Sequence, residues 1–192
     1  MTVADLQKDP GALRVAQNLF AANCAMCHGS DARGAKGFPN LTSPNLTWGG
    51  DADSVVATIS NGRQGVMPAW KDTLGEAGVT AVANYVYSLS GRSAPADLVA
   101  AGKQTFDTMC AACHGADGRG NVTLGAPNLT DKVWIYGGSL DTIKETIANG
   151  RTNRMPAHLE LLGAQKVKVL AAYVLSLSPA GATTAGNGAP GG

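Results

Sequence analysis

The pattern Cys-x-x-Cys-His occurs twice in this chain of 192 residues, and it constrains the fold more than any other feature. The first copy ends at His28 and the second at His114, and the similarity between the two regions continues well past both. After a two-residue insertion, further motifs match at a constant displacement. They are Pro39-Asn40-Leu41-Thr42 with Pro127-Asn128-Leu129-Thr130, Gly49-Gly50 with Gly137-Gly138, Asn61-Gly62-Arg63 with Asn149-Gly150-Arg151, Met67-Pro68-Ala69 with Met155-Pro156-Ala157, and Tyr85-Val86 with Tyr173-Val174. The chain is therefore expected to be a tandem duplication.

The duplication predicts two domains of similar size with a short linker between them. We expect an N-terminal lead-in at 1–10, a first domain at 11–91, a linker at 92–97, a second domain at 98–178 and a flexible tail at 179–192. The linker region contains Ser, Ala and Pro, which suit turns. The tail consists almost entirely of Gly, Ala, Thr and Pro and has little to bury.

Each repeat has the pattern of helices separated by Gly- and Pro-rich loops, and no segment carries a clear strand signal. A first helix leads into each Cys-x-x-Cys-His segment. Middle helices are expected at 53–60 and 139–148, where acidic or hydroxyl residues stand at the start and Asn-Gly at the end. Closing helices are expected at 80–89 and 164–177. The expected fold class is all-α.

Two cysteines one helical turn apart, followed directly by a histidine, form the pattern that attaches haem c. The thiols reach the two vinyl groups of the porphyrin, and the histidine turns its imidazole toward the iron. A zinc site is the alternative for paired cysteines, but zinc ribbons place their pairs roughly 15 to 20 residues apart, far closer than here. We therefore predict two covalently bound haem c groups. The attaching residues are Cys24, Cys27 and His28 for one group and Cys110, Cys113 and His114 for the other.

The sixth ligand decides what a haem iron does, because a methionine thioether favours electron transfer whereas an open position permits catalysis. The chain has five methionines. Met1 is terminal, Met26 lies between two haem cysteines, and Met109 directly precedes one. Met67 and Met155 remain, each in a loop stiffened by a following proline, and we expect both to be distal ligands. The alternative for each is an ordinary core methionine.

The expected ligand pairs follow the repeats, His28 with Met67 and His114 with Met155. His158 is the one histidine outside the two motifs, three residues after Met155. It could compete for the second iron, although an exposed loop histidine is the ordinary alternative.

Residues around the haems are suggested by matching positions in the two repeats. The carbonyl groups of Pro39 and Pro127 are the expected acceptors for the second ring nitrogen of the two haem histidines. Four further side chains are candidates for contacts with the haem propionates, the alternative being surface arginines and packed aromatic residues. The four are Arg63, Arg151, Trp48 and Tyr136.

The composition agrees with cores that contain a large flat group. Apolar residues make up 44% of the chain but aromatic residues only 5%, which is thin for two small self-sufficient cores. The formal charge of +1 gives no reason to expect nucleic acid or an acidic membrane face as a partner. No segment approaches the roughly 18 to 20 apolar residues of a membrane span. Because haem c is attached outside the bacterial cytoplasm, we expect a periplasmic protein whose signal or anchor has been removed or lies upstream of Met1.

Taken together, these motifs resemble the periplasmic dihaem part of the third subunit of cbb-type cytochrome c oxidases. The likeness runs over about 9–178 and includes Lys8-Asp9-Pro10, Gly37-Phe38-Pro39-Asn40-Leu41 and Leu124-Gly125-Ala126-Pro127-Asn128-Leu129-Thr130. The resemblance implies two tandem class I cytochrome c domains with axial ligands at the four His and Met positions above. It also implies that electrons arrive from a quinol-oxidising complex or a small cytochrome, pass between the haems and continue to the catalytic oxidase subunit in aerobic respiration. A native tether to the inner membrane is likewise implied by the family that the motifs resemble.

Other functions share parts of this pattern. A free periplasmic dihaem cytochrome has the same duplicated fold and ligand pattern and carries electrons to oxidases. A dihaem peroxidase or a thiosulfate-oxidising enzyme needs an open iron or an unusual ligand, whereas haem attachment uses all four cysteines here. Gas sensing through a labile methionine is a further possibility. Carbon monoxide binding to the reduced protein would separate these functions from simple electron transfer.

Overall fold

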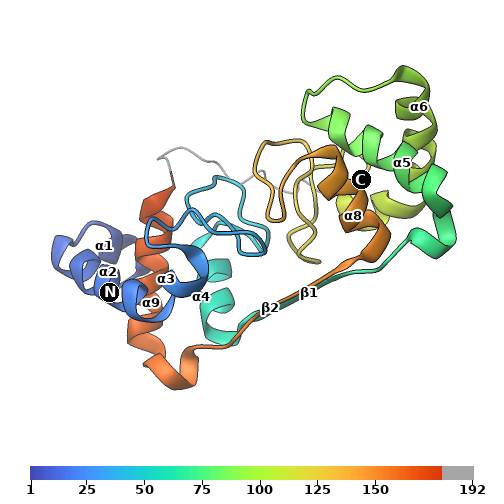
Figure 1. Cartoon of the computed structure of the whole chain (residues 1–192). Helices are drawn as coiled ribbons and strands as arrows, with labels where there is room; N and C mark the ends of the chain where they lie inside the picture. Colours follow the sequence, from blue (N-terminus) through green and yellow to red (C-terminus); the bar gives the residue numbers. More distant parts are fainter. Residues whose placement is uncertain (179–192) are drawn as a thin grey trace, which may run out of the picture.

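The computed structural model describes residues 1–178, and the regular structure of this part of the chain is mostly helical, as predicted. The predicted tail at 179–192 lies outside the described residues. Figure 1 shows two groups of helices joined by a thin two-stranded ribbon. Within the described residues, no helix is both long enough and apolar enough to cross a membrane. The elements are α1 (Val3–Gln7), α2 (Pro10–Asn23), α3 (Ala25–His28), α4 (Ala52–Asn61), β1 (Arg63–Met67), α5 (Lys71–Leu89), α6 (Ala96–Thr105), the π-helical turn η1 (Phe106–Cys110), α7 (Ala111–His114), α8 (Leu140–Asn149), β2 (Arg151–Met155) and α9 (Leu159–Leu177).

Local sequence accounts for where these helices begin and bend. The side chain of Asp9 caps α2, and those of Asp51 and Ser139 cap the middle helices α4 and α8 by accepting backbone N–H hydrogen bonds. Each closing helix is interrupted by a glycine with positive φ, Gly75 in α5 and Gly163 in α9. The parts that follow these glycines correspond to the closing helices predicted from the sequence.

The closing helices are exchanged between the repeats. α5, which ends the first repeat, packs against α6 and α8 of the second, and α9, which ends the second repeat, packs against α1, α2 and α4 of the first. In Figure 1 the green α5 accordingly lies with α6 and the orange α8, and the red-orange α9 lies with the blue α1 and α2. Two lobes result. We call residues 1–63 with 155–178 the split lobe, and residues 67–151 the inserted lobe.

The predicted domains at 11–91 and 98–178 are therefore not the units that pack together in this structure. The reason lies in the duplication, because the closing helices carry equivalent apolar faces and either one fits the groove of either repeat. Val82 of α5 and Leu170 of α9 occupy matching positions and are almost completely buried, each in the core of the other repeat. The sequence pattern does not distinguish between the two pairings.

An antiparallel ribbon of β1 and β2 carries the chain between the lobes, with Gly65 opposite Asn153 at its centre. The sequence gives no strand signal here, and the prediction of loops at these positions needs this correction. Met67 and Met155 end the two strands, and each precedes a proline, which favours extended backbone in the residue before it. Two equivalent loops have thus straightened and paired with each other.

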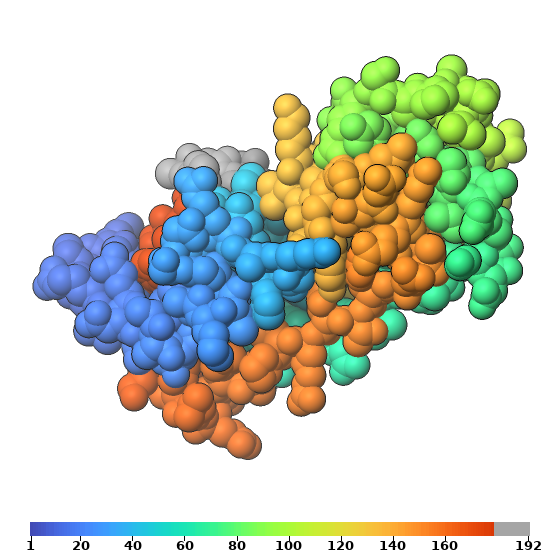
Figure 2. Space-filling view, in the orientation of Figure 1, coloured from blue at the N-terminus to red at the C-terminus, as the bar shows by residue number. Residues whose placement is uncertain are grey.

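The lobes also touch through the loops that follow the two Cys-x-x-Cys-His segments. The N–H of Gly37 donates to the carbonyl of Ile135 over 2.8 Å, and the side-chain amide of Asn45 donates to Asp131 over 3.0 Å. In the space-filling view of Figure 2, atoms of the blue loop meet those of the yellow to orange loop at the centre of the molecule. The contact holds the two loops side by side.

The predicted lead-in and linker are both parts of the packed lobes. The lead-in contains α1, which packs against α9 and buries Leu6. In the linker, the guanidinium group of Arg92 lies over the rings of Tyr87 and Trp134, at 4.6 and 5.4 Å, and donates to the carbonyl of Gly138. These contacts fix the linker to the inserted lobe.

Candidate haem sites

Each Cys-x-x-Cys-His segment forms a turn of helix at the end of a longer one. In the split lobe the N–H groups of Cys27 and His28 both donate to the carbonyl of Cys24, over 3.1 and 2.9 Å, which places the three side chains on one turn. α7 repeats the arrangement in the inserted lobe. Burial raises the pKa of Cys24 and of Cys110 above the usual value for a thiol. Both therefore stay protonated at neutral pH.

The two motif histidines are buried, and each is held in one orientation. His28 Nδ1 lies 3.2 Å from the carbonyl oxygen of Pro39, and His114 Nδ1 lies 3.3 Å from that of Pro127. Because a carbonyl oxygen can only accept, Nδ1 carries the proton and Nε2 keeps its lone pair free for a metal. Burial also lowers the pKa of both imidazoles. The two sites thus present neutral imidazoles, and the acceptors are the carbonyl groups suggested by the sequence.

The methionine loops reach the lobe that holds the other repeat's histidine. Met155 packs against the core of the split lobe, which contains His28, and Met67 packs against the core of the inserted lobe, which contains His114. The expected pairs, His28 with Met67 and His114 with Met155, are not the pairs that this structure brings together. The cause is the exchange, because each methionine directly precedes a closing helix that packs with the other repeat.

His158 lies in the split lobe, so the predicted competition for the second iron does not match its position. The backbone N–H of His158 donates to the carbonyl of Ile59 over 3.0 Å, and its ring Nδ1 is buried without a hydrogen-bond partner among the described residues. Burial lowers the pKa of His28, the hydrogen bond to Pro39 opposes this, and the nearby imidazole of His158 adds to the lowering. Trp70 holds the matching place in the inserted lobe, where its backbone N–H donates to the carbonyl of Ile147 over 3.0 Å. The two sites therefore differ here in a titratable group.

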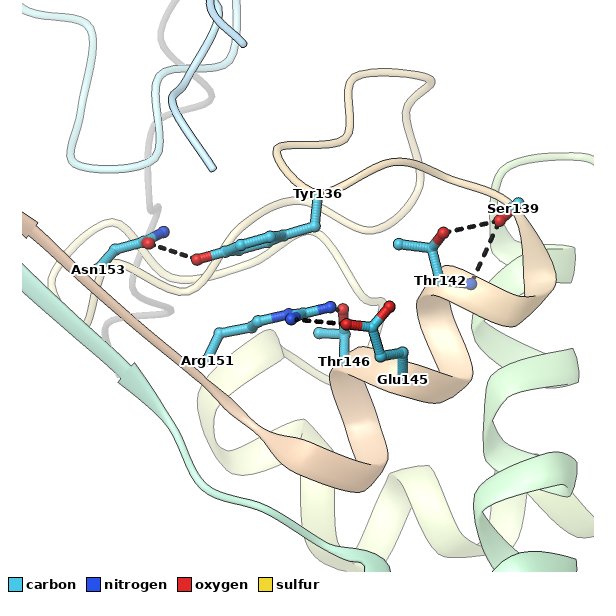
Figure 3. A network of polar contacts seen from close by, with 7 residues as sticks. All are labelled: Tyr136, Ser139, Thr142, Glu145, Thr146, Arg151 and Asn153. Atoms are coloured by element: carbon cyan, nitrogen blue, oxygen red, sulfur yellow. Dashed lines mark hydrogen bonds and ion pairs between the residues drawn. The ribbon is translucent and has the colours of Figure 1, made fainter. Parts of the chain in front are cut away.

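In the inserted lobe, Arg151 is at the centre of a polar network (Figure 3). Its guanidinium group lies over the ring of Tyr136 at 4.3 Å, its Nε donates to the hydroxyl of Thr146 over 3.0 Å, and its Nη1 donates to Glu145 over 3.2 Å. The hydroxyl of Tyr136 donates in turn to the side-chain oxygen of Asn153 in β2. The network positions two of the four predicted propionate contacts side by side.

The split lobe has a simpler version of this arrangement. Arg63 lies over the ring of Trp48 at 4.9 Å, and its Nε donates to the hydroxyl of Thr58 over 2.9 Å. Gly65 takes the place of Asn153, and the indole of Trp48 lies close to its backbone. The other two propionate candidates are thus also brought together.

Two buried N–H groups of the inserted lobe have no hydrogen-bond partner among the described residues. They are Nε1 of Trp134 and Nη2 of Arg151. Leaving a buried donor unpaired costs roughly 1–3 kcal/mol, and a carboxylate such as a haem propionate is an acceptor for both. Together with the two cysteine thiols of the attachment motif and the neutral imidazole, these donors fit a haem c group. Trp134 is absent from the sequence predictions because it matches Leu46 in the first repeat, so that comparing the repeats selects Tyr136 instead.

Comparison with known proteins shows similarity over both repeats. The family described as "Cytochrome C oxidase, cbb3-type, subunit III" matches residues 11–86 and 97–174. The chain is 49% identical to the cbb3-type cytochrome c oxidase subunit CcoP of Rubrivivax gelatinosus, over 90% of this chain and 57% of that protein. It is 44% identical to subunit FixP of Bradyrhizobium sp. (strain ORS 278), over 92% of this chain and 66% of that protein. Subunit FixP of Azorhizobium caulinodans is also 44% identical, with 90% and 64% covered. The chain thus spans somewhat less than two thirds of these relatives.

Proposed function

Because this chain belongs to the family of cbb3-type cytochrome c oxidase subunit III, and is thus a cytochrome of the haem c-binding class, we propose that it carries two haem c groups and transfers electrons through them. The observation that supports this proposal is an arrangement present in both lobes. A buried imidazole on a turn with two cysteines has its Nδ1 tied to a carbonyl group, and a methionine loop packs against the same core. When bound, haem c supplies a one-electron couple between ferric and ferrous iron.

In this proposal the protein holds each haem and excludes solvent from its two faces. The cysteines of each motif would form the thioether bonds, His28 and His114 would be the proximal ligands, and Met67 and Met155 would be the distal ligands. A thioether ligand favours the ferrous state and closes the sixth position. The proline carbonyl groups fix the tautomer and the ring orientation of each histidine. Neither site then has an open position for substrate chemistry.

Polar side chains at the haem edges complete the sites. In the inserted lobe, Trp134 Nε1 and Arg151 Nη2 are the donors that lack an acceptor, and we assign them to propionates. Tyr136 stacks on Arg151 and holds it in place. In the split lobe the corresponding role falls to Arg63, stacked on Trp48.

The same proposal covers the path of the electrons. The loops that follow the two haem-attachment segments touch, with Gly37 bonded to Ile135, which supports transfer between the haems inside the chain. By analogy with the relatives, the partners are the other subunits of an oxidase complex and a donor cytochrome or quinol-oxidising complex. The location is the periplasm, in aerobic respiration.

Two measurements on the purified protein test this function. The intact mass and a haem-stained gel should show two covalently bound haems, and carbon monoxide should leave the spectrum of the reduced protein unchanged. Two variants are positive controls, Met67→Ala and Met155→Ala, and each should create one site that binds carbon monoxide. Fewer than two haems, or carbon monoxide binding at either haem of the unmodified protein, would contradict the proposal.

A further inference from the structure

We infer that the indole ring of Trp48 is the bridge for electron transfer between the two haem sites, by way of the backbone that contains Gly125. This inference rests on the proposed function, since it requires haem at both sites. It goes further because it assigns the transfer inside the chain to one side chain and to the loop that this side chain touches. In the transfer, one electron leaves the ferrous site as the ferric site gains it, and no bond forms or breaks.

The ring of Trp48 lies at the edge of the first site and also touches the inserted lobe. On one side, the guanidinium group of Arg63 lies over the ring at 4.9 Å. On another side, a Cβ atom added to Gly125 would overlap Cζ2, Cε2 and Cη2 of the ring. Since non-bonded carbon atoms pack at about 3.5–4.0 Å, the six-membered part of the indole rests directly on the backbone of Gly125. A side chain of the first site is thus in contact with the loop of the second.

The backbone that Trp48 touches leads directly to the histidine of the second site. Pro127, two residues after Gly125, has the carbonyl oxygen that lies 3.3 Å from Nδ1 of His114. The route from the ring to the imidazole therefore consists of one van der Waals contact, the backbone of 125–127 and one hydrogen bond. Electronic coupling falls less steeply through bonded and packed atoms than through empty space, so this route favours transfer between the sites.

Hydrogen bonds and a glycine conformation hold this part of the loop against the ring. Asn121 and Ala126 exchange two backbone N–H to carbonyl hydrogen bonds, 2.9 and 3.0 Å long, which close the turn that contains Gly125. Gly125 has a φ of +65°, which glycine adopts without the steric cost that a Cβ atom brings. A side chain at this position would therefore be strained and would also displace Trp48.

The matching contact in the opposite direction is looser. In the duplication Tyr136 corresponds to Trp48, and Gly37 corresponds to Gly125. A Cβ atom added to Gly37 would lie 3.8 Å from Cε1 of Tyr136, so a methyl group fits between this ring and the backbone. The hydrogen bond from Gly37 to Ile135 also joins the loops, but neither of these residues has a ring at a haem edge. The two aromatic residues are therefore not equivalent, and Trp48 makes the closer contact.

NMR exchange spectroscopy of the half-reduced dihaem protein measures the transfer rate, because each haem methyl group has separate signals in the oxidised and reduced states. Trp48→Leu should lower this rate several-fold, and Trp48→Phe, which keeps a ring, should lower it less. Tyr136→Leu removes the matched ring and should have a smaller effect than Trp48→Leu. The control is Phe38→Leu, which removes an exposed ring from the loop of the first repeat and should leave the rate unchanged.

The outcomes separate this inference from the proposed function. If Trp48→Leu leaves the rate unchanged, or if Trp48→Phe is as slow as Trp48→Leu, the ring is not the bridge and the inference fails while the function stands. Redox titration of each variant gives the two reduction potentials, and a slower rate that a shifted potential accounts for also overturns the inference. If the unmodified protein exchanges electrons only between molecules, at a rate proportional to its concentration, the internal transfer in the proposed function fails.

A structural measurement covers the case in which a Trp48 variant does not fold. In the NMR spectrum of the fully reduced protein, nuclear Overhauser contacts should join the Hζ2 proton of Trp48 to the Hα protons of Gly125. Gly125→Ala should abolish these contacts and should also slow the exchange, although Trp48 itself is retained. Absence of the contacts in the unmodified protein, or an unchanged rate in Gly125→Ala once the ring has moved away, would overturn the inference.

Discussion

The split lobe and the inserted lobe are built from the same elements in a different chain order. In the inserted lobe the closing helix α5 comes first, and the attachment segment and the middle helix follow without interruption. In the split lobe the closing helix α9 arrives only after the whole inserted lobe. Equivalent contacts form in both, such as Gly62 on Met155 and Gly150 on Met67. Chain order therefore does not decide which segments pack together here.

The difference between the lobes shows what does decide the pairing. Because the repeats offer equal grooves, packing energy hardly distinguishes the exchanged arrangement from one that follows the repeats. Loop-closure entropy distinguishes them only weakly, since each doubling of a loop costs about 0.6 kcal/mol. The remaining factor is the connection between middle and closing helix. The residues before Pro68 and Pro156 are extended and pair with each other in the ribbon. An extended backbone leads the chain across to the other lobe and does not fold it back onto its own repeat.

Removing a core side chain from one closing helix should give the largest effect. Leu170→Ala should destabilise the split lobe by about 2–5 kcal/mol, the usual cost of a buried leucine, because Leu170 is buried among residues of the first repeat. Hydrogen exchange measured on peptides should show lost protection in 10–62. The matched variant Val82→Ala removes less volume and should loosen 96–150 instead.

This pair of variants has an internal control, since each leaves one lobe unchanged. Protection in the inserted lobe should be the same in Leu170→Ala as in the unmodified protein, and the reverse holds for Val82→Ala. Loosening of 96–150 by Leu170→Ala would mean that the closing helices pack with their own repeats.

Substituting the glycines that touch the methionine loops should have the next largest effect. Gly62 combines positive φ with ψ near −175°, a conformation that costs other residues about 1–3 kcal/mol, and an added Cβ would also press on Met155. Gly62→Ala should therefore displace the Met155 loop, and Gly150→Ala the Met67 loop. Methionine alkylation identifies the displaced sulfur. Exposure of Met67 in Gly62→Ala would contradict the assignment of loops to lobes.

Much of the fold and the site follows from the sequence, for reasons that are local. The Cys-x-x-Cys-His turns, the caps at Asp51 and Ser139, and the carbonyl partners Pro39 and Pro127 depend on residues close together in the chain or repeated in both halves. Helix pattern and turn chemistry report such features well. The all-α fold and the family are confirmed for the same reason.

The sequence fails where the duplication makes two answers equivalent or where the repeats differ. Which closing helix fills which groove is invisible in a pattern that both repeats share, so the lobes that pack together differ from the predicted domains, and each methionine loop packs in the lobe of the other repeat. Trp134 is missed for the opposite reason, because it has no aromatic counterpart at Leu46. Its buried Nε1 becomes evident only from the packing around it. Exchange and asymmetry are thus properties of the tertiary structure.

The two lobes also differ in one hydrogen bond between a side chain at the haem site and the ribbon. The hydroxyl of Tyr136 donates to Asn153 in the inserted lobe, whereas Trp48 and the bare backbone of Gly65 occupy the matching place in the split lobe. Tyr136→Phe and Asn153→Ala should each lower the free energy of unfolding by about 0.5–1.5 kcal/mol. Denaturant unfolding of both single variants and the double variant measures the coupling. If the two losses simply add, the hydrogen bond contributes nothing.

The caps of the two middle helices should give the smallest difference. Asp51 caps α4 and accepts hydrogen bonds from the side chain and the N–H of Ser54, which lower its pKa. The folded-state pKa is therefore below the unfolded value near 3.8, so the stabilisation is complete above that pH and is lost as the pH falls further. Ser139, the cap of α8, does not titrate. Because Asp51 is exposed, the loss should stay below about 1 kcal/mol.

Exchanging the two caps tests this explanation without removing either one. Hydrogen exchange between pH 5 and pH 3 should show α4 losing more protection than α8 in the unmodified protein, once the intrinsic exchange rate at each pH is accounted for. Asp51→Ser should make α4 as insensitive to acid as α8, and Ser139→Asp should transfer the acid sensitivity to α8. If α4 still loses protection in Asp51→Ser, the acid sensitivity belongs to the split lobe as a whole. The cause would then be its assembly from two distant chain segments.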